Sequence, residues 1–186
     1  MAISFLCTLI IQDHTIGDSL SWDYYGDEEV KAVGEAIRSG WVGLGRKTAG
    51  FEEKFARFCD VKYCVGLNSG TAALDMALRL LGINHGDEVI VPTMTFVSTA
   101  HCVAYNLATP IFADIDEETL NINIEDAARK ITQRTKAVIA VHYGGRPVDI
   151  DKLKDVVGDI RIPVLKQVVV HNQYFIIQYL NIHIPT

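Results

Sequence analysis

Short, continuous apolar runs alternate with helical patterns along most of this chain. The runs expected to form strands are 62–67, 88–91, 111–113, 137–141 and 162–165. The segments with helical spacing of apolar residues are about 27–39, 48–58, 70–81, 95–106, 124–131 and 149–157. Strands that are apolar throughout, with helices between them, are typical of a parallel sheet covered on both faces. The expected fold class is therefore α/β, a mostly parallel sheet flanked by helices.

Ser69, Gly70 and Thr71 lie between an expected strand and the helix that follows it. The first N–H groups of a helix have no intrahelical partners, and the helix dipole places partial positive charge there. Small and hydroxyl-bearing residues at such a turn therefore favour a phosphate-binding site. The alternative is an ordinary helix N-cap, formed by Asn68 or Ser69 without any ligand. The local pattern leaves both interpretations open.

Three further residues follow strands or glycine-rich turns. Phe96 comes after Pro92 at a strand end, where it either stacks on a flat ring or packs in the core below the next helix. His142 ends another strand, where it either contacts a ligand or is simply a polar residue at the rim of the crevice. Trp41 lies in a loop between Gly40 and Gly45, either over a substrate or against the N-terminal helix. Ligands in parallel sheets bind beyond the carboxyl ends of the strands.

The acidic run from Asp114 to Glu118 permits a metal or acid–base interpretation, but a solvated turn with a helix cap is preferred. The four cysteines are Cys7, Cys59, Cys64 and Cys102. Their spacing is not that of metal ligands, and we expect them to be reduced residues that pack in the core. We therefore expect no metal site.

The charge balance and the first residues exclude other classes of function. The net charge is −6 and Lys and Arg form no basic stripe, so nucleic acid is not expected as a partner. The apolar start, residues 1–11, is too short to span a bilayer and lacks the basic region and cleavage site of a signal peptide. These features predict a cytoplasmic protein that does not bind membranes.

The chain resembles the pyridoxal-phosphate-dependent sugar aminotransferases of the DegT/DnrJ/EryC1/StrS family over about residues 20–165. The stretches that carry this resemblance are 39–42 (SGWV), 51–55 (FEEKF), 68–74 (NSGTAAL), 86–92 (GDEVIVP), 95–99 (TFVST), 114–116 (DID), 132–137 (TQRTKA) and 141–149 (VHYGGRPVD). Their number and order make the resemblance specific.

The resemblance implies the large domain of a type I aminotransferase with pyridoxal 5'-phosphate as cofactor. Gly70 and Thr71, with Ser69 nearby, would then bind the cofactor phosphate, and Phe96 would stack on its ring. Trp41 and His142 are the candidates for contact with substrate. The implied reaction moves an amino group, commonly from glutamate, to a nucleotide-linked keto-sugar. Such enzymes supply sugars for polysaccharides or antibiotics, and they are usually homodimers.

The chain departs from the family pattern after Leu165. Gln167 occupies the position of the aspartate that pairs with the pyridine nitrogen, and an amide carries no negative charge. The stretch that carries the family's cofactor-linking lysine is absent, and Lys166 is interpreted as a solvated strand-end residue. No catalytic residue is predicted.

The expected organisation has three parts: an unassigned N-terminal extension (1–18), a partial transferase domain (19–165) and a β-prone tail (166–186) that forms a hairpin near residues 171–173. We interpret the change after Leu165 as a frameshift or premature end. The chain is then expected to be a fragment that is inactive alone. The alternatives are a non-catalytic module for phosphate-ligand binding or dimerisation, and a remnant without function.

Overall fold

The structure is a computed structural model that describes residues 4–6, 26–157, 164–170, 173–175 and 177–179, with side chains described for 26–157. The helices are α1 (Asp27–Arg38), α2 (Arg46–Phe58), α3 (Gly70–Leu80), α4 (Ser98–Tyr105), α5 (Ile124–Arg129) and α6 (Ile150–Val157). The strands are β1 (Ser4–Leu6), β2 (Cys64–Gly66), β3 (Glu88–Pro92), β4 (Thr109–Ala113), β5 (Thr135–Tyr143), β6 (Val164–Val170), β7 (Gln173–Phe175) and β8 (Ile177–Tyr179). Each helix and strand predicted from the sequence pattern has a counterpart among them.

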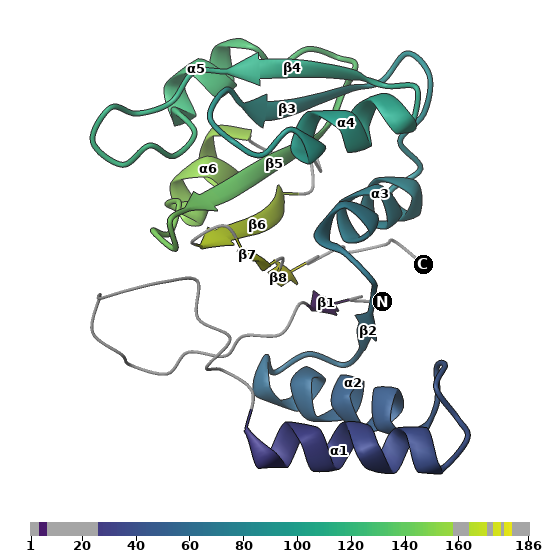
Figure 1. Cartoon of the computed structure of the whole chain (residues 1–186). Coiled ribbons are helices and arrows are strands. Elements are labelled where there is room, and N and C mark those ends of the chain that lie inside the picture. The colour runs from purple at the N-terminus through teal and green to yellow at the C-terminus, as the bar shows by residue number, and fades with distance from the viewer. Residues whose placement is uncertain (1–3, 7–25, 158–163, 171–172, 176, 180–186) are drawn as a thin grey trace.

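The larger sheet has five strands in the order β4-β3-β5-β6-β7 (Figure 1). β3 is parallel to both β4 and β5, and β5 is parallel to β6. β7 is antiparallel to β6, and residues 171–172 between them, where the sequence predicts a hairpin, lie outside the described residues. The expectation of a mostly parallel sheet is confirmed.

Alternate residues of the central strands face opposite layers of helices. Val89 and Val91 of β3 pack with α3 and α4, whereas Ile90 packs with α5 and α6. In β5, Ile139 belongs to the first group and Val138 to the second. Because side chains alternate across a strand, a run that is apolar throughout has two faces to bury. The helices therefore cover both faces, as the sequence predicted.

The α1–α2 pair forms a separate layer below the sheets in Figure 1. Phe51 and Phe55 of α2 pack against Cys64 of β2 in a small third core cluster. α1 buries none of its residues, and its apolar side chains Val33 and Ile37 remain 58% and 63% exposed. The third cluster is therefore formed with α2, whereas the apolar stripe of α1 is exposed on the surface.

The pairing of β2 differs from the sequence prediction of one sheet. β2 is parallel to β1, and β1 is antiparallel to β8, so these three strands form a second sheet. The strand predicted at 162–165 is observed at Val164–Val170, because the run Val168-Val169-Val170 continues the strand beside β5. Most of the predicted extension at 1–18 lies outside the described residues, which include its segment β1.

Candidate functional site

The carboxyl ends of β3, β4 and β5 meet at one edge of the larger sheet, because these strands are parallel. Phe96 follows β3, Asp114 follows β4, and His142 is the next-to-last residue of β5. α3 and α4 pack side by side on one face of this sheet and share a core cluster with β3 and β5. The start of α3 and the turn before α4 therefore belong to the same layer.

The turn 69–71 forms the start of α3. Ser69 is the N-cap: its Oγ accepts a hydrogen bond from the Ala72 N–H at 3.1 Å. Gly70 is buried, Thr71 is partly buried, and the first turn of the helix carries no acidic residue. The first turn of α1 instead carries Asp27, Glu28 and Glu29. The predicted N-cap is thus observed at a helix start whose local charge suits an anion.

Phe96 lies in the turn between β3 and α4. The residue is 39% exposed, and its carbonyl accepts a hydrogen bond from the Thr99 N–H at 2.9 Å. Beside it, the hydroxyls of Thr95 and Thr99 are 2.7 Å apart. Phe96 lies outside the three core clusters of the described residues. Its partial exposure suits a ring-stacking role better than a core role.

His142 is partly buried near the end of β5. Its Nδ1 accepts a hydrogen bond from the Val148 N–H at 2.9 Å, so the loop 144–147 closes back on the imidazole. A nitrogen that accepts a hydrogen bond carries no proton. The imidazole is therefore neutral in this arrangement, with its proton on Nε2.

Trp41 lies on the loop between α1 and α2, apart from the residues that follow the sheet strands (Figure 1). It is 67% exposed, and its indole N–H donates to the Leu44 carbonyl at 2.7 Å. A Cβ added to Gly45 would lie 2.5 Å from the Trp41 ring, so glycine is needed there for close packing. The contacts fix Trp41 against its own loop.

The acidic run after β4 forms the solvated turn that the sequence analysis preferred. Asp116 accepts hydrogen bonds at Oδ1 from the Glu118 N–H and from the N–H and hydroxyl of Thr119. The Thr119 contacts lower the pKa of Asp116 below its usual value. Among the residues with described side chains, no group of three His, Cys, Asp or Glu residues is placed to hold a metal ion.

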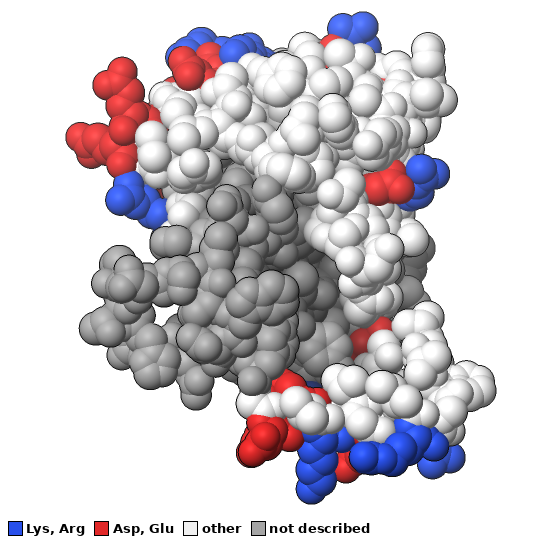
Figure 2. All heavy atoms as spheres, in the orientation of Figure 1, with Lys and Arg blue, Asp and Glu red and all other residues white. Residues whose placement is uncertain are grey.

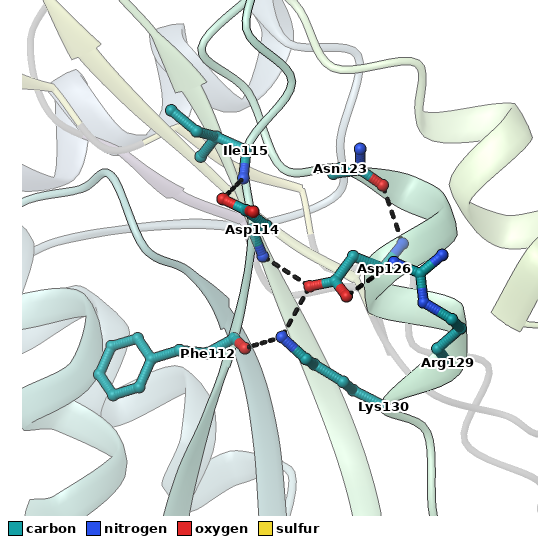
Figure 3. Close-up of polar contacts among 7 residues, drawn as sticks. All are labelled: Phe112, Asp114, Ile115, Asn123, Asp126, Arg129 and Lys130. Carbon is teal, nitrogen blue, oxygen red and sulfur yellow. Dashed lines mark hydrogen bonds and ion pairs between the residues drawn. The ribbon is translucent and has the colours of Figure 1, made fainter.

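Asp126, which the sequence analysis did not single out, organises the end of β4 (Figure 3). Its Oδ2 accepts from the Asp114 N–H at 2.7 Å and from Lys130 Nζ at 2.7 Å, and its Oδ1 accepts from Arg129 at 3.0 Å. Lys130 Nζ also donates to the Phe112 carbonyl at 2.7 Å. The bond from Asp114, followed by that from Lys130, lowers the pKa of Asp126 to about 2.

Two cysteines behave as the packing residues that the sequence predicted. Cys102 of α4 is fully buried, and burial raises its pKa to about 12. Cys64 of β2 is buried, and burial together with the charge of Glu52 raises its pKa to about 11. Thiols with such pKa values are poor nucleophiles at neutral pH. Cys7 lies outside the described residues.

Among the described residues on the face drawn in Figure 2, charges lie mostly toward the upper and lower ends, with acidic and basic groups side by side. None of the helices among the described residues is long and apolar enough to cross a bilayer. The candidate functional groups are the start of α3, which suits an anion, and the side chains of Phe96 and His142 at the ends of the neighbouring strands β3 and β5. An anion-binding helix start and an aromatic ring are the kinds of group that bind an aromatic phosphate ester, the class to which pyridoxal phosphate belongs.

Comparisons with known proteins agree with this class. The chain is 48% identical over 128 residues to the spore coat polysaccharide biosynthesis protein SpsC of Bacillus subtilis, covering 69% of this chain and 33% of that protein. It is 43% identical over 132 residues to the dTDP-4-dehydro-2,3,6-trideoxy-D-glucose 4-aminotransferase of Saccharopolyspora spinosa, covering 70% and 34%. The chain thus spans about a third of the length of these curated relatives.

A solved structure gives the same result for the fold. Spr1654 of Streptococcus pneumoniae, solved in PLP and PMP forms, superposes with a TM-score of 0.74 at 32% sequence identity. The alignment covers 76% of this chain and 40% of that chain. The fold is therefore that of the pyridoxal-phosphate-dependent aminotransferases.

The profile of the DegT/DnrJ/EryC1/StrS aminotransferase family matches residues 23–168, and the chain belongs to this family. The cofactor of the family is pyridoxal phosphate. The resemblance predicted over about 20–165 is confirmed.

Proposed function

We propose that this chain forms the cofactor-phosphate site of a nucleotide-sugar aminotransferase. The reaction is the transfer of an amino group, from glutamate, to the keto group of a nucleotide-linked sugar used for polysaccharide or antibiotic biosynthesis. The names of the relatives support this substrate class, since one acts on a dTDP-linked keto-sugar and another serves spore coat polysaccharide biosynthesis. The observation that carries the proposal is the start of α3.

The phosphate of the cofactor would bind at the turn 69–71. The N–H groups of Gly70 and Thr71 precede the first residue whose amide is bonded within the helix, and the Thr71 hydroxyl adds a further donor. Ser69 fixes the turn through its bond to the Ala72 N–H. Phe96 would cover the ring, and His142 and Trp41 would contact the substrate.

Bound pyridoxal phosphate supplies an electron sink for the carbon that exchanges the amino group. In the family an aspartate stabilises the protonated pyridine nitrogen and a lysine links the cofactor. Gln167 stands at the aspartate position, on β6 opposite Val141 of β5, and the lysine motif does not occur in the 186 residues. We therefore propose that these residues alone bind the cofactor without completing the transfer.

The first experiment measures phosphate-dependent binding by fluorescence titration with pyridoxal phosphate and with pyridoxal. The phosphate ester is expected to bind at least tenfold tighter than pyridoxal. Thr71→Val should weaken binding of the phosphate ester by at least about tenfold, since a hydrogen bond to a charged group contributes about 1.5–3 kcal/mol. Thr109→Val, at an exposed position on β4, is the matched control and should leave binding unchanged. Equal affinity for both compounds would refute the site.

The second experiment tests for covalent attachment. The complex is reduced with borohydride, and mass spectrometry is used to look for a cofactor–lysine adduct in the chain. The expected result is an unmodified chain and no amino transfer from glutamate. A lysine adduct accompanied by turnover would contradict the proposal that these residues alone are not catalytic.

Reversible binding without turnover would equally describe a non-catalytic phosphate-ligand module, which is the second candidate function. The replacement of a charged aspartate by Gln167 favours it. The proposal includes a cytoplasmic location and a second copy of the chain as partner, since the family resemblance implies homodimers. Sedimentation equilibrium gives the mass of the assembly, and a monomer at every concentration would contradict the dimer.

A further inference from the structure

Asn121 lies between two loops at the carboxyl edge of the larger sheet. It belongs to the loop after β4, it is 4% exposed, and its side chain bonds to the loop after β5. Its Oδ1 accepts from the Tyr143 N–H at 3.0 Å, and its Nδ2 donates to the carbonyls of Arg146 and Pro147, each at 3.2 Å. One buried amide thus bonds to three backbone groups, one in the last residue of β5 and two in the loop that follows it.

That loop needs such support because of its backbone conformation. Gly144 and Gly145 have φ values of 59° and 80°, both in the left-handed region. Glycine adopts this region without strain but loses more conformational entropy than other residues on ordering. The Arg146 side chain adds a second tie between the loops, since it donates to the Glu118 carbonyl. The loop is therefore held by long-range contacts rather than by local preference.

The end of this loop contacts His142. The Val148 N–H follows directly after the carbonyl that Asn121 holds at Pro147, and it donates to His142 Nδ1 at 2.9 Å. A shift of the Pro147–Val148 peptide would remove this donor. Nδ1 would then lose the hydrogen bond that keeps it unprotonated, and the preference for the proton on Nε2 would weaken.

We propose that Asn121 is a positioning residue that fixes the tautomer of His142. Through the Pro147–Val148 peptide, it keeps Nδ1 unprotonated and leaves the ring with an N–H donor at Nε2. A donor of this kind suits an oxygen acceptor, such as the keto group of a sugar or the carboxylate of an amino donor. This chemical consequence rests on the proposed function, whereas the tautomer itself does not.

The test is NMR of ¹⁵N-histidine-labelled protein without ligand, with the His142 signals assigned by their loss in His142→Gln. Wild type should show a proton on Nε2 and a pyridine-type Nδ1. Asn121→Ala should give averaged tautomers and at least tenfold faster amide hydrogen exchange at Tyr143 and Val148. Asn123→Ala, which removes the N-cap of α5 two residues away, should leave the His142 spectrum unchanged.

Asn121→Asp separates the two roles of the amide. It keeps an acceptor for the Tyr143 N–H but places a carboxylate oxygen against two carbonyls. The Tyr143 amide should stay protected while the His142 tautomers average. This variant decides the question if Asn121→Ala does not fold. A proton on Nδ1 in wild type, or an unchanged His142 spectrum in the folded Asn121 variant, would overturn the proposal.

The outcome is independent of cofactor binding. A fixed tautomer in a protein that does not bind pyridoxal phosphate would support the positioning role and refute the proposed function. Binding of pyridoxal phosphate by wild type with averaged His142 tautomers would support the function and refute the positioning role.

Discussion

Asp126 joins the end of β4 to α5 through three hydrogen bonds to its carboxylate. These bonds favour the charged form, and the pKa of Asp126 falls from 3.8 to about 2. A group whose pKa is lower in the folded state stabilises that state at a pH above its unfolded pKa. The contribution is lost as the pH falls through the folded pKa, when the carboxylate accepts a proton in both states.

The first prediction concerns acid stability. Asp126→Asn should lower the free energy of unfolding at pH 7 and pH 5, because the amide is uncharged beside Lys130 and Arg129. The difference from wild type should shrink between about pH 4 and about pH 2, since wild type loses its charge there. Urea unfolding of both proteins at several pH values measures this difference in the free energy of unfolding. Asp151→Asn, with a side chain 96% exposed, is the control and should show no comparable loss at pH 7.

The residues differ in how well sequence reveals them. Ser69 could be identified because a cap lies next to the helix that it starts, and Phe96 because it directly follows a strand. Asn121 and Asp126 could not, because the contact of Asp126 with the Asp114 N–H and that of Asn121 with the Tyr143 N–H span 12 and 22 residues. A contact between the loops that follow β4 and β5 depends on the sheet order, in which β3 lies between these two strands, and no local pattern specifies that order.

At the scale of elements, α3 and α1 have similar apolar spacing but different burial. α3 buries Leu74, Ala77 and Leu78 completely, and these residues join the core cluster that includes β3 and β5. α1 buries no residue, and its acidic first turn and basic last turn are favourable for a helix on the surface. Helical periodicity therefore predicts both helices but does not predict that α1 leaves its apolar stripe exposed.

The second prediction compares these helices. Leu78→Ala should lower the free energy of unfolding by about 2–5 kcal/mol, the usual cost of truncating a fully buried leucine. Val33→Ala on α1 should change it by less than about 0.5 kcal/mol, because the side chain is 58% exposed. Urea unfolding measures both variants. A loss above about 1.5 kcal/mol for Val33→Ala would show that the α1 stripe is buried in solution.

The strands show the same limit of sequence analysis. β3 and β5 are apolar on both faces and were predicted with nearly correct bounds. The run at β2 also predicts a strand, but its partner β1 is 58 or more residues away in the sequence. β6 extends beyond its predicted end because three consecutive valines favour the sheet.

At the scale of the whole molecule, the core divides into clusters of unequal size. Two large clusters cover opposite faces of β3 and β5, and a third joins α2 to β2. Opening of the central strands must expose both large clusters, whereas α1 opens without exposing a buried side chain. Local opening free energies should therefore differ widely across the chain.

The third prediction is the hydrogen-exchange pattern. Amides of residues 137–141 should exchange through global unfolding, and those of α1 at least about 100-fold faster. Leu78→Ala should speed exchange in 137–141 by about 30-fold or more, the factor for a loss of about 2 kcal/mol, and leave α1 unchanged. Equal exchange rates in α1 and β5, measured by NMR or mass spectrometry, would contradict this division of the core.

The turn 69–71 and Phe96 follow strands of different sheets, and α3 packs against α4 between them. Asn106 crosses this contact, donating to Asp75 Oδ1 and to the Cys102 carbonyl, each at 2.8 Å. The packing of α3 against α4 therefore sets the distance between the turn 69–71, which we propose binds the cofactor phosphate, and Phe96, which we propose covers the cofactor ring. Ala73 and Ala77 of α3 share a core cluster with Cys102 and Val103 of α4, so larger side chains at these alanines should increase the spacing of the two proposed contacts without changing either of them.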